Sequence, residues 1–63
     1  MYSVTMEVEL NGSISTKVII GSLLSNNEAW EAGHTWLMEN NRPYECLDIR
    51  LNGEVVDYVS WEP

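Results

Sequence analysis

The sequence predicts an α+β fold: a single ββαββ domain over residues 1–63, with a four-stranded sheet and one helix packed across one face. Three observations predict this class. Regions near both ends alternate apolar and polar residues with the period of a β-strand, and a segment between them repeats its apolar residues with the period of a helix. An Asn-Gly pair divides each alternating region in two, as in a tight β-hairpin. A chain of 63 residues has room for one domain.

The first predicted strand covers residues 2–10, and its alternation is unbroken. Its apolar side holds Tyr2, Val4, Met6, Val8 and Leu10, and its polar side holds Ser3, Thr5, Glu7 and Glu9. In such a strand one side faces a core and the other faces solvent. Asn11-Gly12 follows and favours a hairpin turn, because both residues tolerate positive φ.

The second predicted strand covers residues 13–20, and its register depends on the length of the turn. A two-residue turn would place Leu10 on the same face as Lys17. A three-residue loop would instead match Leu10 to Ile14 and Val18. Because a one-residue slip exchanges the two faces of a strand, the apolar pattern favours the three-residue loop.

A capping box predicts where the helix begins. The Ser25 hydroxyl can accept a hydrogen bond from the Glu28 N–H, while the Glu28 carboxylate reaches back to the Ser25 N–H. The helix is expected to cover residues 26–40. Its apolar arc consists of Ala29, Trp30, Gly33, Trp36 and Leu37. Gly33 at the centre of this arc predicts a close approach of helix to sheet, since glycine inside a helix otherwise costs about 1 kcal/mol relative to alanine. The expected core contains Trp30, Leu37, Val4, Val8, Ile49 and Val56.

The last two predicted strands cover residues 44–51 and 54–61, and a two-residue turn at Asn52-Gly53 joins them. The third strand is expected to turn Leu47, Ile49 and Leu51 inward and Cys46, Asp48 and Arg50 outward. With a two-residue turn, the fourth strand turns Val56 and Tyr58 inward. Its expected outward residues are Val55, Asp57, Val59 and Trp61.

The helix joins the two hairpins, and the simplest closed sheet places the first and last strands side by side and parallel in its centre. The favoured strand order is then 2-1-4-3. In element order and length this layout resembles the β-grasp arrangement of small immunoglobulin-binding bacterial domains. The resemblance implies a fold and no functional residue. Other orders that keep both hairpins intact stay open.

The charge is strongly acidic, with three Lys and Arg against ten Asp and Glu and a formal net charge of -7. Nucleic acids and anionic membranes both select cationic surfaces, so we expect no nucleic-acid partner and no membrane partner. The apolar runs are short, which predicts no transmembrane helix, and no secretory leader is evident. Cys46 is the single cysteine, so no internal disulfide is expected. A cytoplasmic location is the expected one.

Few residues could support catalysis or metal binding. The register of the last hairpin sets Asp48 directly across from Asp57, and we expect Arg50, not a metal ion, to relieve the repulsion between them. His34 and Cys46 are predicted on opposite sides of the sheet, so they could not act together as base and nucleophile. One Cys and one His also leave a zinc site unfilled. The sequence therefore predicts a protein that is not an enzyme, with no cofactor and no metal.

The outward face of the sheet is the predicted contact surface for a partner protein. Its expected apolar anchors are Trp61, Val59 and Val55. Its expected charged surround consists of Asp57, Asp48, Glu7 and Glu9. There is an alternative for each set of residues. Trp61 could fold back as a local cover, and the acidic residues could serve only to keep the chain in solution.

The predicted function is that of a small acidic, non-enzymatic protein-binding module that docks on a basic protein surface. Small acidic chains without disulfides are typical of phage and mobile-element accessory proteins, so an inhibitor or adaptor of that kind is the more specific form of the hypothesis. The alternative is a structural homo-oligomer, such as a homodimer, assembled through its open sheet face or an edge strand.

Overall fold

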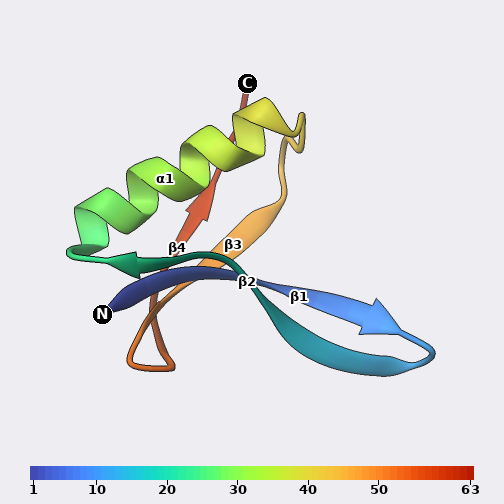
Figure 1. Cartoon of the computed structure of the whole chain (residues 1–63). Helices are drawn as coiled ribbons and strands as arrows, with labels where there is room; N and C mark the ends of the chain where they lie inside the picture. The colour runs from blue at the N-terminus through green and yellow to red at the C-terminus, as the bar shows by residue number, and fades with distance from the viewer.

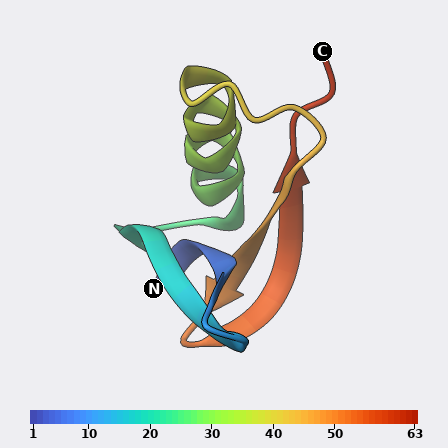
Figure 2. The same cartoon turned by 90° about the vertical axis from the view of Figure 1, so that its right-hand side faces the viewer.

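The computed structural model describes residues 1–63 and confirms the predicted α+β class and the ββαββ order of elements. The elements are β1 (Tyr2–Leu10), β2 (Ser13–Leu23), α1 (Asn26–Glu39), β3 (Cys46–Leu51) and β4 (Glu54–Ser60). They form two layers, with α1 against one side of a curved four-stranded sheet (Figures 1 and 2). α1 is neither long enough nor apolar enough to cross a membrane.

The favoured strand order 2-1-4-3 is wrong. The sheet has the order β2-β1-β3-β4, and every neighbouring pair is antiparallel, so β1 lies beside β3 and not beside β4. β2 and β3 therefore run in the same direction on either side of β1, and α1 carries the chain across β1 from one to the other. This order puts Val4, Leu47 and Ile49, which are all fully buried, on the two central strands. The β-grasp order would have placed β4 in the centre instead of β3.

The first hairpin closes with a two-residue turn, so the predicted three-residue loop is wrong. Leu10 is the partner of Ser13, and Asn11 and Gly12 both have positive φ, at 53° and 80°. This is the backbone that a tight hairpin turn needs. As a result Ile14 lies on the face away from α1 and is exposed.

A bulge in β2 explains why the apolar pattern misled. Val18 is the partner of Thr5, but Ile20 is the partner of Val4, so the strand carries one extra residue between these pairs. The faces of β2 exchange at this point, as they do at a β-bulge. Ile20 therefore packs against the core, while Val18 faces away from α1.

A bulge in β4 reverses the predicted faces of that strand. The two-residue turn is confirmed, because Leu51 is the partner of Glu54. Between Ile49 and Arg50 the register then shifts by one residue, and Ile49 pairs with Asp57. From that point on, the residues expected outward lie on the helix side, and those expected inward lie on the opposite side.

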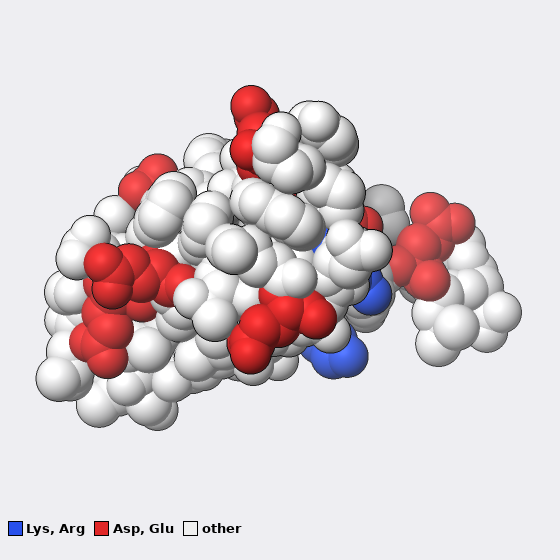
Figure 3. Space-filling view, turned by 90° about the horizontal axis from the view of Figure 1, so that it is seen from above, with Lys and Arg blue, Asp and Glu red and all other residues white.

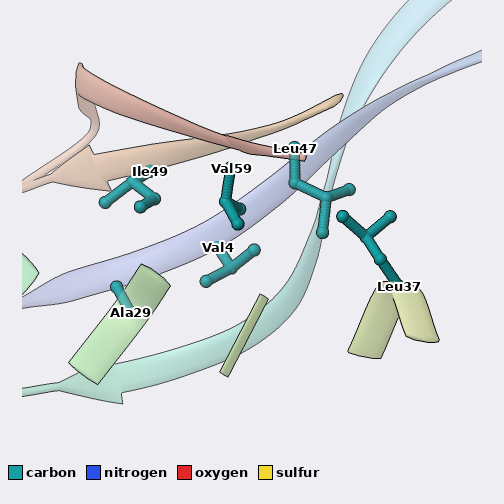
Figure 4. Close-up of a cluster of buried hydrophobic side chains, with 6 residues drawn as sticks. All are labelled: Val4, Ala29, Leu37, Leu47, Ile49 and Val59. Carbon is teal, nitrogen blue, oxygen red and sulfur yellow. The ribbon is translucent and has the colours of Figure 1, made fainter. Parts of the chain in front are cut away.

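The core lies between α1 and the sheet (Figure 4). Its fully buried members are Val4, Ala29, Leu37, Leu47, Ile49 and Val59. The predicted close approach at Gly33 is confirmed: a Cβ atom at that position would lie 2.6 Å from Cγ1 of Val59. The expectation that Trp30 is buried is wrong. Its side chain is 39% exposed and stacks on the His34 ring, with 4.9 Å between the ring centroids.

The tip of the first hairpin projects beyond the rest of the sheet. β1 pairs with β3 only over residues 2–5, so beyond that point its one neighbour is β2. This projecting part is called the arm here and comprises residues 6–10 and 13–17; Figure 1 shows it extending away from α1. Leu10 and Ile14 point to opposite faces of the arm and are 71% and 68% exposed. Neither face of the arm is therefore covered at its tip, whereas Met6 at its base packs against the core.

Candidate protein-contact surface

The face of the sheet opposite α1 is uncovered and carries apolar side chains; it is called the open face here. One row of partners crosses all four strands on this face: Val18, Thr5, Asp48 and Tyr58. The two outer members of the row, Val18 and Tyr58, are each 60% exposed. Val56, the extra residue of the β4 bulge, lies two residues before Tyr58 on the same strand and is also exposed.

Two hydrogen bonds hold the Arg50 side chain on the open face, one to the central strand β1 and one to the second turn. Its Nε donates a hydrogen bond to Oγ1 of Thr5 at 3.1 Å, and its Nη1 donates to the Gly53 carbonyl oxygen at 2.8 Å. Thr5 is thereby buried on a face that no other element covers. Both acceptors are neutral, so the Arg50 guanidinium forms no ion pair within the chain.

The structure does not place the three predicted apolar anchors together on the open face. Val59 is a core residue beneath Gly33. Trp61 is half-buried and packs against the core, and its carbonyl oxygen accepts a hydrogen bond from the Tyr44 N–H at 2.8 Å. It is therefore the local cover that the alternative interpretation expected. Val55 is half-buried and pairs with Arg50 near the turn.

Asp57 lies on the helix side, and the predicted Asp48–Asp57 pair does not exist. Asp48 pairs with Tyr58 instead. The Asp57 carboxylate accepts hydrogen bonds from Nδ2 of Asn26 and from the Tyr58 N–H, both at 2.8 Å. These two bonds hold the pKa of Asp57 below its ordinary value of 3.8, and the bond from Asn26 has the larger effect. Asp57 thus ties β4 to the first turn of α1, where the helix dipole also favours a negative charge.

The other predicted acidic residues are free of such bonds. Asp48 is half-buried on the open face, and Glu7 and Glu9 are exposed on the arm. None of them forms an ion pair, since the single salt bridge of the chain joins Arg42 to Glu45 at 3.4 Å. Figure 3 shows acidic side chains in several separate groups, one of them on the projecting arm, with few basic side chains near them.

A groove opens at the base of the arm, where β1 and β3 separate. Their pairing ends at Thr5 and Asp48, and beyond this pair the two strands leave an open space of about 430 Å³. Its lining consists of Met6, Glu7, Glu45, Cys46, Leu47, Asp48 and Tyr58. The groove combines apolar surface with three carboxylates.

Cys46 is poorly suited to nucleophilic chemistry in this groove. Partial burial, and then the neighbouring Asp48 carboxylate, raise the pKa of its thiol above the ordinary value of 9.0. A reactive cysteine needs the opposite shift. His34 belongs to α1, on the other side of the sheet, and stacks on Trp30. No three His, Cys, Asp or Glu side chains lie close enough together to hold a metal ion.

The sequence did not point to Val18 and Tyr58, the two exposed apolar members of the open-face row. One signal was present: Val55 and Val56 are consecutive apolar residues that interrupt the alternation of the last strand. Such an interruption is what a bulge with one extra residue produces. A comparison of the chain with protein-family models, curated proteins and solved structures found no match in any of the three.

Proposed function

We propose that this chain is a small acidic protein-binding module, without catalysis of its own, that docks through its open face on a basic surface of a partner protein. One observation carries the proposal. The row Val18, Thr5, Asp48 and Tyr58 crosses the whole sheet, exposes apolar side chains at both ends and is covered by no other element.

The chemistry of this face suits a protein partner. Tyrosine is a frequent anchor of protein interfaces, because it combines a large apolar ring with a hydroxyl group. Tyr58 stands at one edge of the sheet, and the exposed Val56 beside it enlarges its apolar surface. Arg50, tied to Thr5 and Gly53, gives the middle of the face a fixed shape before a partner arrives. A preformed surface loses less conformational entropy on binding.

The charge of the chain favours a basic partner. With a formal net charge of -7, a basic surface is attracted over distances of about a Debye length, roughly 8 Å at physiological salt. Asp48, Glu7 and Glu9 place part of this charge beside the open face without internal ion pairs. An inhibitor or adaptor, as encoded by phages and mobile elements, is the more specific form of the proposal.

Affinity capture with matched baits tests the proposal. Tyr58→Ser and Val18→Ser remove exposed apolar side chains from the open face, and Met38→Ser removes one from α1 as a control. We expect the same protein to be captured by the wild-type and Met38→Ser baits, lost with either open-face bait, and released by raised salt. Capture that is identical with all four baits, or that does not depend on salt, would contradict the proposal.

The alternative of a homo-oligomer draws on the two sheet edges. β2 and β4 each have a neighbour on one side only, so their outer backbone groups are free to pair with a strand of another copy. The net charge of -7 opposes this assembly, because two copies repel each other. Sedimentation velocity over a range of concentrations and salt separates the two functions: a stable dimer at low salt would favour the homo-oligomer.

A further inference from the structure

We infer that the groove at the base of the arm receives an arginine side chain from the partner protein. This inference rests on the proposed function and adds to it the chemical group that is recognised. It follows from three features of the groove: its origin between two separating strands, its apolar lining, and two carboxylates that form no ion pair.

The groove is a consequence of the strand pairing. β1 follows β3 over four residue pairs, from Tyr2–Leu51 to Thr5–Asp48, and then continues into the arm. β3 begins at Cys46, and beyond Thr5 and Asp48 the two strands leave a notch whose lining includes Glu7, Asp48 and Tyr58 of the open face. A long, unbranched side chain can enter such a notch without moving the backbone.

The lining of the groove matches the two parts of an arginine side chain. Met6 and Tyr58 provide apolar surface for the aliphatic stem, while Leu47 lines the floor of the groove with its side chain buried in the core. Long basic side chains commonly bury their methylene groups in this way while the charged end stays at a polar rim. The Tyr58 ring, exposed at the edge of the groove, also offers a flat surface on which a guanidinium group can stack.

Two of the three carboxylates of the groove form no ion pair within the chain. Glu7 and Asp48 form no ion pair, and Arg50, the nearest guanidinium on the open face, donates to Thr5 and Gly53 instead. Lys17 is the partner of Met6 in the arm and forms no ion pair either.

Glu45, the third carboxylate of the groove, already contacts Arg42 at 3.4 Å. The groove therefore offers two unpaired carboxylates to an incoming cation.

Arginine fits these features better than lysine. Its planar guanidinium donates in two parallel directions to carboxylates and stacks on aromatic rings, whereas the lysine ammonium is a compact and strongly hydrated charge. Lysine would satisfy the carboxylates but not use the Tyr58 ring in the same way. The structure thus predicts that the groove prefers arginine to lysine, although the two side chains carry equal charge.

An NMR titration of the full chain tests the inference. The probes are three blocked peptides of serine and glycine that differ only in a central arginine, lysine or citrulline. We expect saturable shifts at the amides of Met6, Glu7, Leu47 and Tyr58 with the arginine peptide, weaker ones with lysine, and none with the uncharged citrulline. Equal effects of arginine and citrulline, or shifts spread evenly over the chain, would overturn the inference.

Two charge-neutralising variants and a matched control complete the test. Asp48→Asn and Glu7→Gln should each weaken binding of the arginine peptide by about tenfold, as loss of a charged hydrogen bond does. Glu31→Gln removes the same charge from an exposed position on α1 and should leave the affinity nearly unchanged. An equal loss in all three variants would show that only net charge matters and would overturn the inference.

The outcomes separate this inference from the proposed function. If a captured protein is lost with Val18→Ser but is unaffected by Asp48→Asn and Glu7→Gln, the open face binds a partner and the groove does not hold its arginine. If the arginine peptide binds the groove and no protein depends on Val18 or Tyr58, the groove is a site and the proposed docking surface is wrong.

Discussion

The two hairpins share one turn sequence and have opposite environments. Each turn reads Leu-Asn-Gly, and in each the Asn and the Gly have positive φ. The second turn is tied down, because Asn52 Oδ1 accepts from the N-terminal ammonium of Met1 at 2.9 Å and the Asn52 N–H donates to the Met1 carbonyl oxygen at 3.2 Å. The first turn ends the projecting arm and has no such contacts.

The difference shows that an Asn-Gly turn is enough to close a hairpin but does not determine which surface the hairpin packs against. β3 and β4 lie under α1 and supply Leu47, Ile49 and Val59 to the core. The arm of β1 and β2 supplies nothing to the fully buried core. A two-stranded ribbon alone is marginally stable in water, so the arm is the part of the sheet that the core supports least.

The largest expected effect contrasts a core leucine with an arm leucine. Leu37 points from α1 toward Leu47 and is fully buried (Figure 4). Leu37→Ala should lower the free energy of unfolding by about 2–5 kcal/mol. Leu10→Ala, in the arm, should change it by less than about 0.5 kcal/mol. Urea unfolding of both variants measures this, and equal losses would mean that the arm is part of the cooperative core.

A second effect probes the close contact of the second hairpin with α1. Gly33→Ala would improve helix propensity by about 1 kcal/mol. Yet the new Cβ would lie 2.6 Å from Val59 Cγ1 and 3.3 Å from Val4 Cγ1, so we expect a net loss of roughly 1–3 kcal/mol from overpacking. Thermal unfolding gives the sign directly. A stabilised variant would show that α1 lies farther from Val59 and Val4 than these distances indicate.

The two turn glycines sharpen the comparison further. Gly12 and Gly53 have φ of 80° and 88°, and a Cβ would meet no atom within 4 Å at either position. Alanine therefore introduces the same local strain, about 1–2 kcal/mol. We expect Gly53→Ala to lower the melting temperature more than Gly12→Ala does, because local opening of the arm can relieve the strain at position 12. A larger fall in melting temperature for Gly12→Ala would show that the arm is held as firmly as the second hairpin.

The smallest expected effect concerns the tie between β4 and α1. Because the folded protein lowers the pKa of Asp57 below 3.8, its carboxylate adds stability above that pH. This contribution is lost as the pH falls through the folded-state pKa. Asp57→Asn should therefore destabilise slightly at neutral pH, and its difference from wild type should shrink as the pH falls below about 4. Denaturant unfolding across this range measures it, and a difference independent of pH would assign the effect to packing.

The sequence was sufficient to predict elements with strong local signals. The helix is confirmed, and the Glu28 N–H donates to Ser25 Oγ at 3.0 Å as the capping box requires. The other half of that box differs, because Glu28 Oε2 accepts from the Leu24 N–H. The second turn and the inward residues of β3 are also confirmed, since turn chemistry and alternation act over a few residues.

The strand order and the exposed residues of the open face could not be predicted in the same way. Alternation assigns faces only while the strand pairing is regular, and the bulges after Val18 and at Val56 each exchange the faces beyond them. Tyr58 therefore replaces Val59 on the surface. The strand order depends on which strands bury the most side chains beneath α1, and this is a property of the whole sheet.

The neighbouring residues Tyr58 and Val59 allow the most direct test of the central claim, that the open face binds and the helix face stabilises. Val59→Ala should lower the free energy of unfolding by about 2 kcal/mol, while the folded fraction keeps its affinity for a captured partner in calorimetry. Tyr58→Ser should leave the unfolding free energy within about 0.5 kcal/mol and weaken that affinity by roughly 30-fold, as at an interface hot spot. The reverse result, with Tyr58→Ser unfolding the chain and leaving binding intact, would contradict the assignment of the two faces.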